Sequence, residues 1–520
     1  MRIIIVALTT LYRENIRGTS ALPYHLLKGL GIMNICPPML QSPQAPLEGG
    51  VQSGSNQTPT QPPPLSQRGG EVPNAPFRGL GGQELAEQDV KCIIYTFNAN
   101  RLTIEQMAEV ERELGVEIRL LPLPRWYRWM FKLHLLWLRM FLRYPFVNYI
   151  TLPQRVVEEI KAQKPDMIWV NGEELSRIVE QFPGMRRIQT GPDVESLYYY
   201  RMMGRRFVMN NVIDYWKCAM MYRKYARLER SFCTDDDFTY YAVGEADIEH
   251  LRQLNPRVHC EFLRHPHYEV AERGPIRFHR PKIKLLIAGQ YNLYMQQTAD
   301  EVLEWIKLQS PQETQSPQAP LKGGVQSGGS DSLLSPQETQ SPQETQSPQA
   351  PLKGGVQSGS HNSSSPFRGL GGRGRGRGQE VLQSYTITFL GKGWERHVEA
   401  LRSMGVEVNH IKFAPDYIEE IIKHDIQVTP ISIGTGTKGK VLDALANGLL
   451  VLGTPYAMEN IAVEHGTSCM VWRTPQELLQ VLQDIPQRIE HYEQMAEAGR
   501  QAVLERHSRH QIAEELFGKL

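Results

Sequence analysis

The chain has 520 residues, with 57 Lys and Arg against 56 Asp and Glu, so its formal net charge is only +1. This balance excludes a dedicated nucleic-acid-binding protein, which carries a basic excess, and we expect no nucleic-acid partner. No run of about 18 uncharged apolar residues occurs, and none of the six cysteines has C-x-x-C spacing. Together these features predict a cytoplasmic protein in a reducing compartment.

Apolar runs alternate with helical patterns along the chain. Residues 2–8 form a short apolar run that predicts a buried first strand rather than a signal peptide, and a helix is expected near 20–30. A further helix is expected over 154–163. Continuous apolar runs separated by helices are typical of parallel sheets covered on both faces, so the sequence predicts a two-domain α/β protein. The further strands are expected at 91–97, 116–121, 166–170, 282–289, 384–390, 406–411, 426–430 and 449–453.

Two low-complexity insertions interrupt this pattern, at 41–82 and 309–379. They share a repeated unit rich in Pro, Gly, Ser and Gln, and the same heptad P-F-R-G-L-G-G occurs at 76–82 and 366–372. Such composition cannot bury enough apolar area to offset chain entropy, so both are predicted to be disordered rather than solenoid repeats. Each falls after a helix and before a strand, which places it opposite the carboxyl edge of the sheet, where ligands bind. The basic R-G-R-G-R-G run at 373–378 could contact RNA, but a solvated linker is the favoured interpretation.

The most informative run begins where a strand ends at Pro430. A glycine-rich turn containing Gly434, Gly436 and Gly439 leads into a helix over 438–447, and Gly448 is expected to end that helix at the C′ position. Free amides at the start of the helix, with Lys438 and Lys440, would form an anion site suited to a diphosphate. An ordinary tight strand-to-helix turn is the alternative. A P-loop is excluded because Val441 stands where the motif needs Ser or Thr.

At this point the sequence resembles a known family. The run from Pro430 to Pro455 is similar to the nucleotide-sugar-binding signature of GT-B glycosyltransferases, and within them of the retaining family 4. Weaker similarity occurs at 191–197 (G-P-D-V-E-S-L), at 241–247 (Y-A-V-G-E-A-D) and at 17–23. The resemblance implies two Rossmann-like parallel-sheet domains facing a cleft. Residues 1–265 would then form the acceptor domain and 266–490 the nucleotide-sugar domain, with 491–520 a helix packing back towards the first.

The resemblance also implies roles for single residues. Asp443 stands where the family has the Glu that holds the ribose diol, and Thr435 replaces a second Glu eight residues earlier. Sugar contacts would then fall to the amides of 434–437 or to Glu459. Lys438, or failing that Lys440, would neutralise the diphosphate, without a metal or a cofactor. The expected donor-binding residues are Arg17, Gly18, Thr19, Gly289, Gly434, Thr435, Gly436, Thr437, Lys438, Lys440, Asp443 and Glu459.

Asp193, Glu195 and Lys438 are the candidate catalytic residues. For the two acids, a helix N-cap or a place in the first helical turn is an equal alternative. His265 and His267 flank Pro266 at the expected hinge, where a linker or donor contact is favoured over a metal site.

The segment 125–144 has five Lys or Arg, three Trp and no acid. Basic, aromatic and apolar residues together are typical of a helix on a membrane surface, which would make the protein peripheral at the inner face of the membrane. A buried helix or an oligomer contact with Arg stems lying along apolar surface is the open alternative.

The sequence therefore predicts a glycosyltransferase that moves a sugar from a nucleotide-sugar donor to a glycan or lipid-linked acceptor with retention of configuration. A nucleotide-sugar epimerase of the same fold and a non-catalytic binding or scaffold protein are the alternatives.

Overall fold

The computed structural model describes residues 1–14, 20–31, 90–191, 193–309 and 377–518. The first insertion, 41–82, and residues 310–376 of the second lie outside the described residues, so their predicted disorder stays a prediction. The prediction was wrong at the two ends of the second insertion, because residue 309 ends one helix and 377–379 begin another. The second of these helices is anchored by Leu382, which is buried in the domain core.

The N-terminal sheet has seven strands, all parallel, in the order β3-β2-β1-β4-β5-β6-β7. In β1 both faces are buried, since Ile3 and Ile5 pack on one side of the sheet and Ile4 and Val6 on the other. The expected strands at 2–8, 91–97, 116–121 and 166–170 are confirmed. The strands are β1 (Arg2–Ala7), β2 (Lys91–Thr96), β3 (Glu117–Leu120), β4 (Met167–Asn171), β5 (Arg187–Gly191), β6 (Phe238–Ala242) and β7 (Cys260–Phe262).

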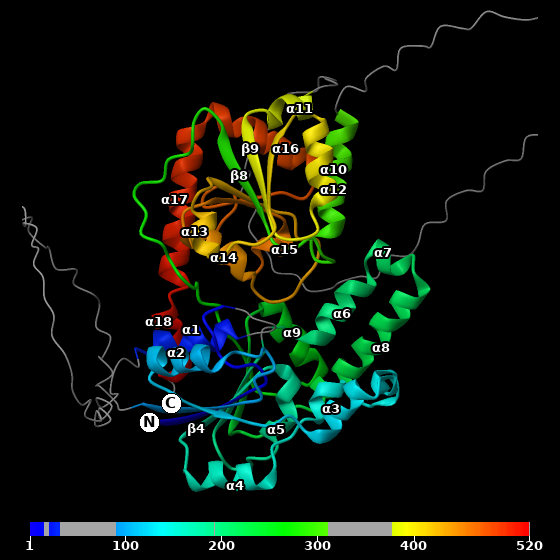
Figure 1. The fold of residues 1–520 in the computed structure, drawn as a ribbon, viewed down its shortest axis with the longest axis vertical. Helices are drawn as coiled ribbons and strands as arrows, with labels where there is room; N and C mark the ends of the chain where they lie inside the picture. The colour runs from blue at the N-terminus through cyan, green and yellow to red at the C-terminus, as the bar shows by residue number, and fades with distance from the viewer. Residues whose placement is uncertain (15–19, 32–89, 192, 310–376, 519–520) are drawn as a thin grey trace, which may run out of the picture.

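Helices cover both faces of this sheet, and one group projects from its side. In Figure 1 α1, α2 and α18 lie on one side of the domain, and α3, α6, α7 and α8 lie on the other. The α-helices are α1 (Ala21–Gly29), α2 (Ile104–Leu114), α3 (Arg125–Lys132), α4 (Gln154–Ala162), α5 (Ser176–Val179), α6 (Glu195–Met203), α7 (Arg206–Met209), α8 (Val212–Glu229) and α9 (Glu245–Leu254). Three 3₁₀ helices are η1 (Leu135–Phe141), η2 (Phe146–Tyr149) and η3 (Glu173–Leu175).

The C-terminal sheet repeats the same topology with six parallel strands, in the order β10-β9-β8-β11-β12-β13. All five strands expected from the sequence in this half are confirmed, and only the two-residue β13 was missed. Its strands are β8 (Ile283–Ala288), β9 (Tyr385–Leu390), β10 (Glu407–Ile411), β11 (Ile426–Thr429), β12 (Leu450–Gly453) and β13 (Met470–Val471). Its helices are α10 (Gln296–Gln309), α11 (Arg377–Leu382), α12 (Glu395–Ser403), α13 (Tyr417–Ile421), α14 (Gly439–Ala446), α15 (Pro455–Met458), α16 (Pro475–Asp484), η4 (Ile485–Gln487) and α17 (Ile489–Arg506). The last helix, α18 (Arg509–Phe517), belongs to the core of the N-terminal domain.

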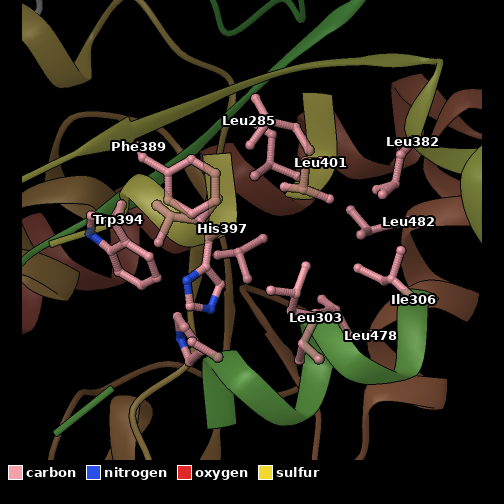
Figure 2. Close-up of a pocket in the computed structure, with 16 residues that line it drawn as sticks. Leu285, Leu303, Ile306, Leu382, Phe389, Trp394, His397, Leu401, Leu478 and Leu482 are labelled. Carbon is pink, nitrogen blue, oxygen red and sulfur yellow. The ribbon is translucent and has the colours of Figure 1, made fainter. Parts of the chain in front are cut away.

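The core on one face of the C-terminal sheet encloses an apolar cavity of about 80 Å³. Figure 2 shows Leu303 and Ile306 of α10, Leu382 of α11 and Leu482 of α16 around it, with His397 at one end. The two helices that flank residues 310–376 are therefore both held by this core.

The chain returns to the N-terminal domain at its end. Helix α17 packs on α14 of the C-terminal domain, and α18 packs against α1. Close packing depends on Gly29, because a Cβ there would lie 2.2 Å from the carbonyl oxygen of Arg509. The Phe517 ring then lies 5.7 Å from the Trp169 ring under the first sheet. Two Rossmann-like domains that face each other across a cleft form the GT-B architecture. No helix in the described ranges has both the length and the apolar character needed to span a bilayer.

Replacing residues 43–80 and 312–374 by short Gly-Ser linkers should leave the melting temperature and the single cooperative unfolding transition nearly unchanged. The reason is that the flanking elements α1, β2, α10 and α11 are all anchored in the two cores. Calorimetry checks this. A matched control, Leu382→Ala in the shortened chain, should cost about 2–5 kcal/mol because it enlarges the cavity. Loss of cooperative unfolding in the shortened chain itself would show that the insertions are structural.

Candidate active site between the two domains

A cavity of about 490 Å³ opens where the carboxyl ends of the two sheets meet. In the C-terminal sheet the strand order reverses between β8 and β11, and ligands bind at such a switch point in doubly wound sheets. The loops after these two strands form most of the wall, including Gly289, Asn292 and residues 429–441. The N-terminal domain contributes Leu22, Asp193 and Val243. The cavity is therefore an interdomain site of the kind that the topology predicts.

The loop after β11 and helix α14 are built as the sequence predicted. Helix α14 ends in a Schellman motif, with Gly448 at φ +76° and the Leu449 amide bonded to the Ala444 carbonyl at 2.9 Å. Gly436 has φ +60°, a conformation that favours glycine. At Gly434 a Cβ would lie 2.9 Å from the Lys438 Cε. Helix α14 thus begins at the wall of the cavity, where its free amides favour an anion.

The two lysines of this run have different surroundings. The Lys438 ammonium folds back onto its own loop and donates to the carbonyl oxygens of Thr435 and Gly436, at 2.8 and 2.7 Å. Burial lowers the pKa of Lys438, and the carboxylate of Asp193 opposes that shift. Lys440 also lines the cavity, and its Nζ lies 5.4 Å from the centre of the Tyr417 ring. Of the two cations, Lys440 is therefore the one whose ammonium is less engaged by hydrogen bonds to the loop.

Asp443 lies one turn into α14 and is only 7% exposed. Burial raises its pKa to about 7, while nearby Lys440 and the backbone amide of Tyr268 act in the opposite direction. Its Oδ1 has no hydrogen-bond partner among the described residues, and the same holds for the buried hydroxyl of the neighbouring Tyr417. Buried polar atoms are almost always paired in folded proteins, so these two atoms are candidates for binding a ligand.

Contacts across the cleft join the glycine-rich loop to the N-terminal domain. The Thr435 hydroxyl donates to Asp193 Oδ1 at 2.9 Å, and the Thr437 hydroxyl donates to the Val243 carbonyl at 2.6 Å. Asp247, which is 1% exposed, accepts from the amide of Gly436 at 3.0 Å and from that of Val194 at 2.8 Å. Burial raises the pKa of Asp247 to about 7.

A salt bridge closes one side of the same cleft. Arg201 of α6 donates to both oxygens of Glu459, at 2.9 and 3.0 Å, and also to the Gly434 carbonyl. Beside it, the Glu245 amide donates to the side chain of Asn460 at 3.0 Å. The sequence analysis gave the sugar contact to the amides of 434–437 or to Glu459. In this structure the Glu459 carboxylate is bonded to Arg201, because α6 reaches across from the other domain.

Glu195 occupies the first turn of α6, the position that the sequence left open as the alternative to catalysis. The helix has no side-chain cap of its own. Its first amides are bonded instead by two buried acids, with Glu173 accepting from the Glu195 amide at 3.2 Å and Glu229 from the Ser196 amide at 2.9 Å. Burial, followed by the neighbouring charge of Asp193, raises the pKa of Glu195 to about 8.

Most of the residues predicted for the site lie together at the cleft. These are Asp193, Gly289, Gly434, Thr435, Gly436, Thr437, Lys438, Lys440 and Glu459, with Asp443 behind them and Glu195 at the base of α6. Arg17, Gly18 and Thr19 lie outside the described residues. His265 lines the cavity, but across the described part of the chain no group of three or more His, Cys, Asp or Glu could hold a metal ion.

Two cleft residues were not predicted from the sequence. Asp247 belongs to the run 241–247 that the sequence analysis quoted, so a signal for it existed. No sequence signal pointed to Arg201, because its role depends on the approach of Glu459, which lies 258 positions further along the chain.

The match to a known protein family lies in the second half of the chain. Residues 377–518 match the family model described as glycosyl transferase-like. The matched range includes the loop after β11, helix α14 and the return helices α17 and α18. No curated protein matches the sequence.

Among solved structures, the chain is similar to HepE from Anabaena in complex with UDP, with 10% identity over 100% of this chain and 99% of that one and a TM-score of 0.49. It is also similar to sucrose-phosphate synthase from Thermosynechococcus elongatus, with 10% identity over 83% and 88% of the two chains and a TM-score of 0.46. A third similar structure is WaaG, a glycosyltransferase involved in lipopolysaccharide biosynthesis, with 12% identity, 82% and 91% coverage and a TM-score of 0.45.

Glu195→Gln should stabilise the protein increasingly as the pH rises. The folded pKa of Glu195, about 8, is above the ordinary value of 4.5, so the folded state retains a proton that the unfolded state has lost. The raised pKa of Glu195 therefore does not destabilise wild type below pH 4.5. It destabilises wild type progressively between pH 4.5 and 8, and by a constant amount above pH 8. Urea unfolding at pH 5 and pH 8.5 measures it, with Glu261→Gln on the domain surface as control. An equal difference between variant and wild type at both pH values would contradict the prediction.

Proposed function

We propose that the chain transfers a sugar from a nucleotide-diphosphate-sugar to a glycan or lipid-linked acceptor, with retention of configuration and without a metal ion. One observation carries the proposal: the interdomain cavity joins the amino end of α14 and Lys440 on one side to Asp193 on the other, and the incompletely bonded Asp443 lies behind this wall, near Lys440. The match of 377–518 to a glycosyl transferase-like model supports it.

The diphosphate is assigned to the amino end of α14. Free helix amides carry partial positive charge, and Lys440 adds a full charge at the same place. Departure of a nucleoside diphosphate develops negative charge on its terminal phosphate. A fixed positive environment stabilises that charge most strongly in a site from which water is largely excluded. Lys438, which is bonded to its own loop, would act mainly by holding the loop in shape.

The nucleoside is assigned to Asp443. A carboxylate can accept hydrogen bonds from two adjacent hydroxyls, as a ribose diol requires. Binding would supply donors to the unpaired Oδ1 and favour the charged form of a group whose pKa is raised to about 7. The sugar would contact the amides of Thr435 and Thr437, because Asp247 already takes that of Gly436 and Arg201 engages Glu459.

The acceptor is assigned to the N-terminal wall of the cavity, beside Asp193. Its carboxylate is partly buried and lies between Thr435 and the charge of Lys438. Glu195 lies close behind it, in a surrounding that raises its pKa to about 8, so that it holds a proton at neutral pH. Asp193 is therefore the residue proposed to orient the acceptor hydroxyl.

Lys440→Ala should weaken binding of a nucleoside diphosphate by about tenfold or more, because a charge-assisted hydrogen bond contributes about 1.5–3 kcal/mol. Its melting temperature without ligand should stay near that of wild type. Lys438→Ala should instead lower the melting temperature, since it removes two bonds that shape the loop. Calorimetric titration with UDP, GDP and CMP tests both. Equal affinity in wild type and Lys440→Ala would remove the phosphate role from Lys440.

The decisive test of the function is product analysis. The purified protein is incubated with UDP- and GDP-sugars in the presence and absence of lipid-linked and free glycan acceptors. Sugar transfer supports the proposal. Conversion of the donor sugar without an acceptor would indicate an epimerase. Binding without turnover would indicate a non-catalytic protein.

Segment 125–144 is proposed to contact a membrane. It forms not one helix but a hairpin, with α3 followed by a left-handed turn at His134 and then η1. Its three Trp side chains are exposed rather than buried, at 39% for Trp126, 63% for Trp129 and 56% for Trp137. Exposed Trp beside five cations suits the headgroup region of an anionic bilayer. A lipid-linked acceptor would be consistent with this placement.

Arg125→Glu, Arg128→Glu and Lys132→Glu together should abolish flotation with anionic vesicles while leaving nucleotide affinity unchanged. Each cation contributes about 1 kcal/mol near such a surface, and the reversed charges are repelled. Because salt screens this attraction, wild type should bind less at 0.5 M salt than at 0.05 M. If the triple variant unfolds, the hairpin is structural. If wild type does not float at either salt, the membrane contact is excluded.

A further inference from the structure

We propose that the exposed stripe of α8 is a second lipid-facing surface, which lays the protein on an anionic bilayer with the mouth of the cleft beside the membrane. The stripe consists of Val212, Tyr215, Trp216, Arg223 and Arg227. The inference rests on the membrane contact in the proposed function and extends it to elements that the sequence gave no reason to single out.

Helix geometry places these five side chains on one face. At 100° per residue, positions 212, 215, 216, 223 and 227 fall within an arc of about 120°. All five are exposed, with Val212 at 82% and Trp216 at 54%. Outside this arc, Lys224 and Leu228 are buried against the domain, whereas Ile213 and Lys217 near the amino end are exposed. Within the arc, the small side chain of Ala226 is buried beside Arg227. The stripe is therefore a solvent-facing surface with large apolar side chains at its amino end and cations at its carboxyl end.

The charges on α8 complement an anionic surface. Arg223 and Arg227 are exposed, whereas the two acids of this helix are both engaged. Asp214 forms an ion pair with Lys217 at 3.0 Å. Glu229 is fully buried and bonded to Ser196. No unpaired acid of α8 therefore opposes the approach of lipid phosphate.

The stripe is continuous with the hairpin of residues 125–144. Arg227 donates to the Arg143 carbonyl at 3.4 Å, and Lys224 donates to the Arg139 carbonyl. Next to this junction the hairpin exposes Trp137 and Phe141, the latter at 76%. The hairpin also encloses an apolar groove of about 750 Å³, which could take up part of a lipid chain. Two surfaces with the same chemistry thus meet at one end of α8.

Helix α8 also lies near the C-terminal domain. Its Cys218 packs on a small cluster in which Met202 of α6 and Val208 of α7 contact Ile433 of the loop after β11, and the Arg205 guanidinium lies 5.1 Å from the centre of the Tyr456 ring. Figure 1 shows α6, α7 and α8 rising from the hairpin side of the N-terminal domain towards the C-terminal domain. With 18 residues, α8 spans about 27 Å, so the stripe extends from the hairpin past this interdomain contact.

A bilayer explains this surface better than a folded partner. Exposed apolar side chains on Tyr200, Met209, Val212, Ile213, Tyr215 and Trp216 gather at the end near the cleft. Elsewhere, Ile104 and Phe413 are equally exposed but lie on separate elements, as single exposed apolar residues do on most proteins. Apolar tips next to exposed cations match the interface of an anionic membrane, which needs no shape complementarity.

The test is flotation with vesicles of phosphatidylcholine containing 30% phosphatidylglycerol at 0.05 M salt. Val212→Glu with Trp216→Glu should lower the bound fraction by about tenfold or more, because two apolar contacts are lost and two repelled charges are added. Ile104→Glu with Phe413→Glu is the matched control, since both side chains are 76% exposed outside the stripe, and it should bind as wild type does. Light scattering gives the oligomeric state, and calorimetry with UDP shows that the cleft is intact.

The outcomes separate the possibilities. If the stripe variant floats like wild type while the Arg125, Arg128 and Lys132 variant does not, only the hairpin binds lipid and the inference is overturned. If wild type is dimeric without vesicles and the stripe variant is monomeric, the stripe is a contact between copies of this chain. If wild type fails to float, the membrane part of the proposed function falls as well, whereas transfer to a soluble glycan would leave the rest standing.

Discussion

One buried carboxylate, that of Asp247, keeps the two halves of the cleft in register. It accepts one amide from each domain, that of Val194 and that of Gly436, and these amides border Asp193 and Thr435. The approach is tight enough that a Cβ on Gly244 would lie 2.0 Å from the Asp247 carboxylate and 3.2 Å from the Gly436 Cα. Because the cavity has walls from both domains, the positions proposed for the donor and the acceptor both depend on this contact.

The same contact concentrates charge in a small volume. Burial raises the pKa of Asp247 and of Asp443 to about 7 and that of Glu195 to about 8, and it lowers the pKa of Lys438. The folded protein therefore retains protons on acids that would be ionised in the unfolded chain near neutral pH. A ligand that pairs with these buried groups would remove part of that cost.

The two sides of the N-terminal domain differ in how they are used. On one side α18 returns from the C-terminal domain and packs on α1, where Gly29 permits the approach. On the other side α6 carries Arg201 across to Glu459, and α8 and the hairpin remain uncovered. The N-terminal domain is thus joined to the C-terminal domain through α1 and α18 on one side and exposes α8 and the hairpin on the other. The proposed membrane contact uses the exposed side.

The sequence by itself determined most of the strands and the glycine-rich loop at 434–439. Nine of the thirteen strands in the described residues could be predicted, most of them because they are buried on both faces and read as continuous apolar runs. Strands β5, β6, β7 and β13 were not among those expected. The turn at 434–439 and the stop at Gly448 could be predicted because local backbone geometry demands glycine there. The basic and aromatic composition of segment 125–144 was also evident in the sequence. It predicted a single helix, because the left-handed turn at His134 has no sequence signature.

Only the tertiary structure decided which charges meet. Asp247 and Gly436 are 189 positions apart, and Arg201 and Glu459 are 258 apart, so no local pattern records either pair. Lys438 and Lys440 look alike in sequence and both line the cavity, yet the Lys438 ammonium bonds its own loop whereas that of Lys440 lies over the Tyr417 ring. The stripe on α8 was likewise hidden, because a helical pattern shows which residues share a face but not which face another domain leaves exposed. Local preferences of the backbone are written into neighbouring residues, whereas burial and charge pairing arise only when distant segments come together.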